Sequence, residues 1–175
     1  MSKGCVIYAY NNGRYDYIYM ASVGAKLVKK FLNIPVTLIT DAPCDLAVFD
    51  SVVIEPKPAE QMRDFGEGLV PWYNQTRSTV YNLSPYDQTL LIDADYFVLN
   101  SNLKALFNSE VEFACYDTVT ELAGTENLER RIGNTSIPMQ WATVIYFTKS
   151  ELAQNVFDFM AYIRDHNDFY SLMYG

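Results

Sequence analysis

The chain has 175 residues, of which half are hydrophobic and 19% are charged, and its formal net charge is −8. This composition excludes a disordered chain, and the length suits one α/β domain spanning residues 1–175 better than two domains. The acidic balance argues against nucleic-acid binding, which needs clustered Lys and Arg. It does not exclude a nucleotide substrate, because a divalent cation can hold a diphosphate on carboxylates.

The N-terminal sequence does not resemble a signal peptide, because the apolar run at residues 5–10 is short and no small-residue cleavage site follows it. No apolar stretch reaches membrane-spanning length. The cysteines, Cys5, Cys44 and Cys115, show no CxxC spacing, so we expect reduced and mostly buried thiols. Together these features predict a cytoplasmic protein without a membrane span.

The first elements of the chain alternate between strand and helix. Residues 5–10 predict a buried strand, which a turn at residues 11–13 ends. Residues 15–32 carry apolar side chains at helical spacing and predict a helix that ends before Pro35. Residues 36–40 predict a second strand. A strand, a helix and a strand with short joints are typical of a βαβ unit, and therefore of a mostly parallel sheet covered by helices.

The middle of the chain extends this α/β pattern. Residues 51–54 predict a short third strand, and residues 76–83 predict a helix. The segment between them, residues 58–71, contains glycines and several charges and predicts a surface loop, which we expect to be a mobile lid. Residues 88–92 predict a central buried strand, because they are mostly apolar up to Asp93.

The last third of the chain predicts two more strands and a helix. The strands are residues 112–116 and 141–147, separated by a long polar segment. Thr148 and Glu151 have the spacing of a capping box, which predicts that the helix begins there. The apolar stripe predicted for this helix consists of Leu152, Val156, Met160 and Ile163.

The strongest chemical signal is the sequence Asp93-Ala94-Asp95, which follows directly on the central strand. In an extended backbone, residues two apart point to the same side, so both carboxylates can face one ion. The carboxyl end of a strand is where open α/β sheets bind ligands. Mg²⁺ or Mn²⁺ suits two carboxylates and substrate phosphates. An Asp-x-Asp pair alone is common, but two adjacent carboxylates after a buried strand would repel each other without a cation.

The sequence around this pair resembles a known family. Residues 86–99, YDQTLLIDADYFVL, are similar to the YDxxLYLDADxLVL stretch of GT-A-fold glycosyltransferases, particularly family 8 and its glycogenin-like and galactosyltransferase-like members. Residues 102–107 continue the motif, and residues 35–41 and 139–147 resemble two further strands of the family. The resemblance implies a Rossmann-like GT-A fold with helices on both faces of the sheet. It also implies transfer of a sugar from a nucleotide-sugar, with a UDP-sugar as the expected donor and Mn²⁺ or Mg²⁺ as the cofactor.

The resemblance implies roles for individual residues. Asp93 and Asp95 match the metal-binding pair, with Asp95 as the more direct ligand. Ala94 matches the small residue beside the ribose, and Arg77 matches a basic residue that reaches the ribose or the diphosphate. The segment that lines the nucleobase pocket corresponds to Tyr8, Ala9, Tyr10 and Asn11. From the sequence alone, Arg77 fits a solvent-exposed helix residue equally well, and the aromatic residues fit an ordinary core.

The chain departs from the family on the acceptor side. Where the family has Asn-x-Gly, this chain has Trp141, Ala142 and Thr143, and Trp141 fits either a sugar-stacking residue or a core aromatic residue. The family's third metal ligand is a C-terminal histidine, whereas the one histidine here, His166, lies in a polar stretch that predicts exposure. The resemblance therefore implies the donor-binding part without the family's C-terminal part, with an open cleft beside Asp95 and little turnover.

The catalytic residues stay open at this point. A retaining transferase needs no strong base, whereas an inverting one would need a carboxylate such as Asp117 or Glu121. Two other functions also fit the sequence. One is a nucleotidyltransferase, although residues 10–15 make a poor Gly-rich phosphate loop. The other is a non-catalytic module that binds a nucleotide-sugar or a partner.

Overall fold

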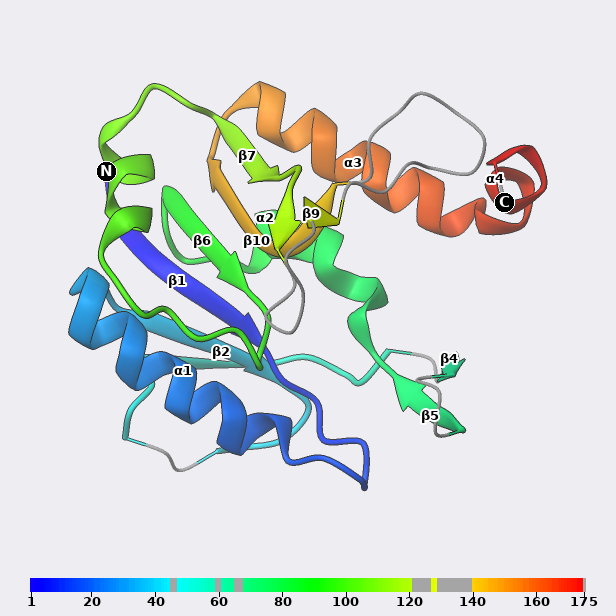
Figure 1. The fold of residues 1–175 in the computed structure, drawn as a ribbon, viewed down its shortest axis with the longest axis horizontal. Helices are drawn as coiled ribbons and strands as arrows, with labels where there is room; N and C mark the ends of the chain where they lie inside the picture. The colour runs from blue at the N-terminus through cyan, green and yellow to red at the C-terminus, as the bar shows by residue number, and fades with distance from the viewer. Residues whose placement is uncertain (45–46, 59–60, 65–67, 121–126, 129–139, 175) are drawn as a thin grey trace.

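The structure is a computed structural model, and it describes all residues except 45–46, 59–60, 65–67, 121–126, 129–139 and 175. Its centre is a six-stranded sheet (Figure 1). In spatial order the strands are β3 (Ser51–Ile54), β2 (Val36–Thr40), β1 (Lys3–Tyr8), β6 (Gln88–Ile92), β10 (Trp141–Thr148) and β7 (Phe113–Tyr116). The first four are parallel, and β10 is antiparallel to both of its neighbours. The predicted mostly parallel sheet is confirmed, with β2, β1 and β6 as interior neighbours.

Helices cover both faces of this sheet. They are α1 (Tyr17–Leu32), η1 (Asn74–Thr79), α2 (Val80–Leu83), η2 (Asn102–Asn108) and α3 (Glu151–Asp165). The last helix, α4 (Asn167–Tyr174), extends past the end of α3, away from the sheet (Figure 1). Side chains of β1 alternate between two buried clusters, because successive strand residues point to opposite faces. Cys5 and Ile7 pack with α1 and η2, whereas Val6 and Tyr8 pack with α2 and α3. The predicted α/β architecture with helices on both faces is confirmed.

The first helix begins and ends at identifiable caps. Asp16 is its N-cap, and its carboxylate accepts a hydrogen bond from the Tyr19 amide at 3.0 Å. Asn33 ends the helix in the left-handed conformation, with φ 56°, and its amide donates to Lys29. The predicted helix is therefore confirmed, although it starts at Tyr17 because Asp16 caps it.

Helix α3 corrects two predictions. Its N-cap is Ser150, whose hydroxyl accepts a hydrogen bond from the Ala153 amide at 3.2 Å, whereas Thr148 is the last residue of β10. The predicted capping box is therefore wrong. The predicted apolar stripe is also wrong at Leu152, which is 52% exposed. Phe157 is buried instead, because its ring packs against the Phe147 ring with 4.8 Å between centroids.

The segment predicted as a loop at residues 58–71 contains a hairpin. Strands β4 (Gln61–Asp64) and β5 (Leu69–Trp72) pair antiparallel, apart from the main sheet. Gly68 has φ +107°, which favours glycine, so the chain can enter β5 there. The prediction of a loop is wrong for residues 61–64 and 69–71, because cross-strand backbone hydrogen bonds form there without any clear apolar alternation in the sequence. Residues 59–60 and 65–67 lie outside the described residues, and the lid role stays a prediction.

The remaining elements match the predictions only in part, and η2, β8, β9 and α4 have no predicted counterpart. The helix predicted at 76–83 is a 3₁₀ segment, η1, followed by the single α-helical turn of α2. The long polar segment contains two short strands, β8 (Val119–Thr120) and β9 (Asn127–Leu128). All three cysteines carry free thiols, but only Cys5 is fully buried. Within the described residues, every helix is too short or too polar to cross a bilayer.

Candidate functional site at the carboxyl edge of the sheet

The predicted site residues come together at one edge of the sheet. The carboxyl ends of parallel strands meet at the same edge, so the residues after β1 lie beside Asp93 after β6. Strand β10 is antiparallel to β6 and therefore starts at this edge, with Trp141. Strand β7 ends there, with Asp117 following it. The predicted position of Asp93 and Asp95 at the carboxyl edge of a central strand is confirmed, because β6 ends at Ile92.

The Asp93–Asp95 pair forms a turn. The Asp93 amide donates to the Thr143 carbonyl at 3.0 Å, and the Tyr96 amide donates back to the Asp93 carbonyl at 3.1 Å. Ala94 is buried and Asp95 is exposed. The expected extended backbone is wrong, because the chain turns directly after Asp93. The two carboxylates consequently have different surroundings. That both carboxylates face one ion stays a prediction.

Arg77 joins the first of these carboxylates. Its guanidinium forms an ion pair with Asp93, and its Nη1 donates to the Ala142 carbonyl at 2.5 Å. The Arg77 side chain is only 11% exposed. Burial lowers the pKa of Arg77 to about 10, opposed by the charge of Asp95 and by Tyr8, so the group stays cationic at neutral pH. The reading of Arg77 as a solvent-exposed residue is wrong, and the structure places a buried positive charge beside the Asp-Ala-Asp turn.

The residues at the end of β1 form a buried aromatic wall. The Tyr8 hydroxyl lies 2.8 Å from the Thr79 hydroxyl, and burial raises the pKa of Tyr8 above its usual value. Tyr10 is also buried, and its ring meets the Tyr73 ring edge-on at 6.3 Å between centroids. Burial, aided by the charge of Glu55, raises the pKa of Tyr10 to about 12, so its hydroxyl is neutral. Both tyrosines are core residues in this structure.

Asn11 fixes the chain after this wall. Its side-chain oxygen accepts a hydrogen bond from the Ile18 amide at 3.1 Å, and its side-chain nitrogen donates to Asp16 at 3.1 Å. Asn12 in turn accepts from the Arg14 and Tyr15 amides. These amides are the groups that a phosphate-binding loop would offer to its ligand. Their internal use disfavours the nucleotidyltransferase reading of this turn.

Lys57 is a site residue that the sequence reading missed. Its ammonium donates to the Asn11 carbonyl at 2.8 Å, lies 3.2 Å from the Asp41 carboxylate and stands 4.9 Å from the centre of the Tyr73 ring. Lys57 thereby ties together the segments that follow β1, β2 and β5. No motif marks it in the sequence, because Asn11 lies 46 residues earlier and the other two partners follow different strands.

Two tyrosines near Asp95 were also missed. Tyr17, in the first turn of α1, has its pKa raised by burial and then by the negative charge of Asp95. Burial and a hydrogen bond with Tyr116 raise the pKa of Tyr96 to about 12. A sequence signal existed for Tyr96, which directly follows the Asp-Ala-Asp turn. Tyr17 has none, because only the packing of α1 against the sheet brings it to this edge.

The acceptor-side candidates lie at the same edge. Trp141 is half-buried and pairs with Tyr116, and the β10–β7 register shifts after it, before Ile145. Bulges of this kind re-aim backbone groups beside sites. The carbonyls of Ala142 and Thr143 here hold Arg77 and Asp93.

Of the two carboxylates predicted as possible catalytic bases, the structure describes only Asp117. Asp117 is exposed and accepts a hydrogen bond from the Thr118 hydroxyl at 3.1 Å. Glu121 lies outside the described residues. The acceptor roles of Trp141 and Thr143 and the catalytic roles of Asp117 and Glu121 stay predictions.

The carboxylates meet part of the requirement for a divalent cation. Across the part of the chain that the structure describes, no three His, Cys, Asp or Glu side chains are grouped so as to hold a metal. His166 is exposed at the end of α3, with its ring stacked on Tyr162 at 4.1 Å between centroids. The oxygens of Asp95 and Asp93 are hard donors of the kind that Mg²⁺ and Mn²⁺ prefer. A cation held by these two carboxylates together with a bound diphosphate stays a prediction.

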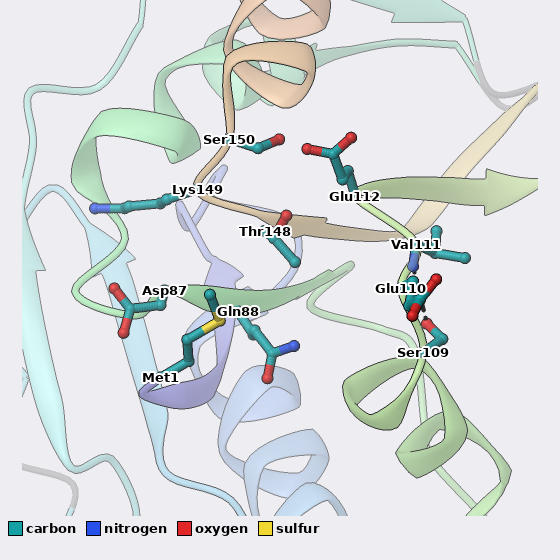
Figure 2. Close-up of a pocket in the computed structure, with 10 residues that line it drawn as sticks. All are labelled: Met1, Asp87, Gln88, Ser109, Glu110, Val111, Glu112, Thr148, Lys149 and Ser150. Atoms are coloured by element: carbon teal, nitrogen blue, oxygen red, sulfur yellow. Dashed lines mark hydrogen bonds between the residues drawn. The ribbon is translucent and has the colours of Figure 1, made fainter.

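A cavity of about 470 Å³ lies at the opposite edge of the sheet (Figure 2). Asp87 and Gln88, at the start of β6, and Lys149, after β10, line it. Lys149 donates to the Ser84 carbonyl at 2.9 Å, and the Asp87 carboxylate accepts from the Ser2 amide at 2.7 Å. These polar groups join segments of the fold. The cavity is separated from Asp93 by the length of β6, so it is not the candidate site.

Comparison with solved structures supports the assignment of the fold. The chain is similar to two crystal structures of the glycosyltransferase GlyE from Streptococcus pneumoniae TIGR4, one of them the apo form. The TM-scores are 0.55 and 0.53, with 12% sequence identity in both cases. The matched region covers 96% of this chain and 39% of GlyE. No protein-family profile and no curated protein sequence matches the chain. The chain therefore has the fold of part of a glycosyltransferase.

Proposed function

We propose that the chain binds a nucleotide-sugar and is the donor-binding part of a glycosyltransferase of the GT-A type, related to family 8. One observation carries the proposal: a buried arginine, Arg77, is paired with the Asp-Ala-Asp turn at the carboxyl edge of the sheet. This edge is where open α/β folds bind nucleotides. The fold shared with GlyE supports the same reading.

The charges at this edge suit a nucleoside diphosphate. The Arg77 guanidinium offers a fixed positive charge, and Asp95 lies exposed beside it. The base would lie toward Asn11 and Lys57, where polar backbone and an ammonium meet the aromatic wall. The proposed donor is a UDP-sugar, and Mn²⁺ or Mg²⁺ is the proposed cofactor, held by Asp95 and Asp93.

The proposed reaction exchanges one bond at the sugar. The bond between the anomeric carbon and the diphosphate oxygen breaks, and the oxygen leaves with the electron pair. An acceptor hydroxyl oxygen bonds to that carbon, and its proton passes to the leaving phosphate or to a carboxylate, for which Asp117 is the described candidate. Arg77 would stabilise the negative charge that develops on the leaving group. A bound divalent cation supplies additional neutralisation of the same charge.

The acceptor would approach over the start of β10. Trp141 and Thr143 lie there, beside the carbonyls that hold Arg77 and Asp93. An aromatic ring in this position can stack on a sugar face.

The test of the proposed function is nucleotide binding by an Asp95→Asn variant. We expect UDP affinity in the presence of Mn²⁺ to fall at least about tenfold, or ~1.4 kcal/mol, because the exposed carboxylate is lost. Isothermal titration calorimetry measures the affinity, and circular dichroism checks the fold. The matched control is Asp87→Asn at the other end of β6, which should bind like wild type. An Asp95→Asn variant that binds UDP as tightly as wild type would refute the site.

Turnover separates a transferase from a binding module. Wild-type protein is incubated with a panel of nucleotide-sugars and Mn²⁺, and release of the nucleoside diphosphate is followed by mass spectrometry. If the wild-type protein releases the nucleoside diphosphate and the Asp95→Asn variant does not, the result supports a transferase. Tight binding without release would indicate a non-catalytic module.

A further inference from the structure

The ion pair between Arg77 and Asp93 bears on how the site can take up a cation. The guanidinium contacts the Asp93 carboxylate and the Ala142 carbonyl, and its Nε is buried without a hydrogen-bond partner among the described residues. Arg77 makes its ion pair with Asp93, and the charge of Asp95 acts on the same guanidinium without an ion-pair contact. The direct pair is strongly held, because its separation would leave two partly buried charges unpaired. Asp93 is therefore already neutralised by a group of the protein.

A divalent cation on the same carboxylate would meet this guanidinium. Ligand oxygens lie about 2.0–2.2 Å from Mg²⁺, so an ion on Asp93 would sit within a few ångströms of Arg77. Like charges at such separations repel, and a partly buried site screens the repulsion less than water does. Asp95 is exposed and belongs to no ion pair among those found in the described residues. In the free protein it is the carboxylate open to an ion.

We propose that Arg77 competes with the divalent cation for Asp93, so that the chain binds the metal weakly alone and takes it up together with a nucleoside diphosphate. The diphosphate would bring oxygens to the ion and negative charge to Arg77, which removes the competition. Metal and nucleotide then strengthen each other's binding by the same factor, as linkage requires. The inference rests on the proposed function, because it assigns the order of events at that site.

The test uses Mn²⁺ alone. Free Mn²⁺ is titrated against wild type and Arg77→Met by electron paramagnetic resonance, without nucleotide. We expect Arg77→Met to bind Mn²⁺ about tenfold more tightly than wild type, within the range typical of coupled sites. The matched control is Arg164→Met, which removes an arginine bonded to the neighbouring Ser78 at 3.1 Å. It should change Mn²⁺ affinity less than about twofold.

A second pair of variants tests the proposal if Arg77→Met does not fold. If Arg77 occupies Asp93, Asp93→Asn should leave Mn²⁺ affinity of the free protein nearly unchanged, whereas Asp95→Asn should lower it about tenfold or more. Equal losses in the two variants would overturn the proposal, because Asp93 would then be open to the ion. A folded Arg77→Met variant with wild-type Mn²⁺ affinity, or without any Mn²⁺ binding, would overturn it too.

The outcomes distinguish this proposal from the proposed function. In a separate titration, UDP is added to the Mn²⁺-loaded protein. Suppose that wild type binds UDP and that Arg77→Met has the same Mn²⁺ affinity as wild type. This result refutes only the proposed competition between Arg77 and the cation for Asp93. Absence of UDP binding at saturating Mn²⁺ refutes the proposed function instead.

Discussion

At the scale of single residues, Asp93 and Asp95 have the same side chain but differ in solvent exposure and in ion pairing. Asp93 is 22% exposed and paired with Arg77, whereas Asp95 is exposed at the tip of a turn. The reason is the Tyr96 amide, which closes the turn on the Asp93 carbonyl. The motif marks the place in the sequence, but the environment of each carboxylate decides which one can meet a ligand first.

Gly4 provides a test of close packing at residue scale. An added Cβ would lie 2.3 Å from ring atoms of Tyr86, whose hydroxyl is held 2.8 Å from Thr37. The ring cannot move aside without breaking that contact, so we expect Gly4→Ala to lower the free energy of unfolding by about 1–3 kcal/mol. Urea unfolding measures the change. Asn155→Ala, on the exposed face of α3, should alter it by less than about 0.5 kcal/mol, and equal effects would contradict the packing.

At the scale of elements, β10 and the segment after β3 shape the site. Strand β10 runs against β6, so its first residues lie beside Asp93 and present the carbonyls of Ala142 and Thr143. The segment after β3 carries Lys57 to the ends of β1 and β2. The hairpin β4–β5 is joined to the same region, because Asn12 donates to the Pro71 carbonyl at 3.4 Å.

Lys57→Met tests whether this junction serves nucleotide binding. The variant keeps the aliphatic stem and removes the ammonium that holds Asn11 and Asp41. We expect UDP affinity to fall about fivefold to tenfold, because the proposed base subsite loses its tie. The unfolding free energy should change by less than about 1 kcal/mol, since the ion pair is partly exposed. Calorimetric titration and urea unfolding measure the two quantities.

The control for this variant is Lys29→Met. Lys29 forms a comparable ion pair with Asp50 at 2.9 Å, at the opposite edge of the sheet. Equal loss of UDP affinity in both variants would show a general charge effect and no role for Lys57 at the site.

At the scale of the whole molecule, the two buried clusters lie on opposite faces of one sheet and contain alternating side chains of the same strands. Packing on either face therefore stabilises the same strands. The proposed site draws on the ends of four strands and on η1, all of which exist only in the folded chain. A ligand of this site therefore binds the folded state and does not bind the unfolded chain.

Thermal stability should report this linkage. We expect UDP with Mn²⁺, at about 100 times the dissociation constant, to stabilise the protein by ~2.7 kcal/mol. For a chain of this length that raises Tm by roughly 5–10 °C. Mn²⁺ alone should have a much smaller effect. Differential scanning calorimetry measures Tm, with Asp95→Asn as the control, and an unchanged Tm for wild type with both ligands would count against the proposed site.

The sequence by itself determined the strands of the main sheet, the helices α1 and α3, and the Asp93–Asp95 position after residues 88–92. These are local properties, because apolar periodicity and chain direction set them. Tertiary structure decided the rest. The burial of Arg77, the reach of Lys57 and the approach of Tyr17 depend on partners distant in sequence. The pairing of β4 with β5 depends on backbone hydrogen bonds between two strands, and no alternation of apolar residues marked it in advance.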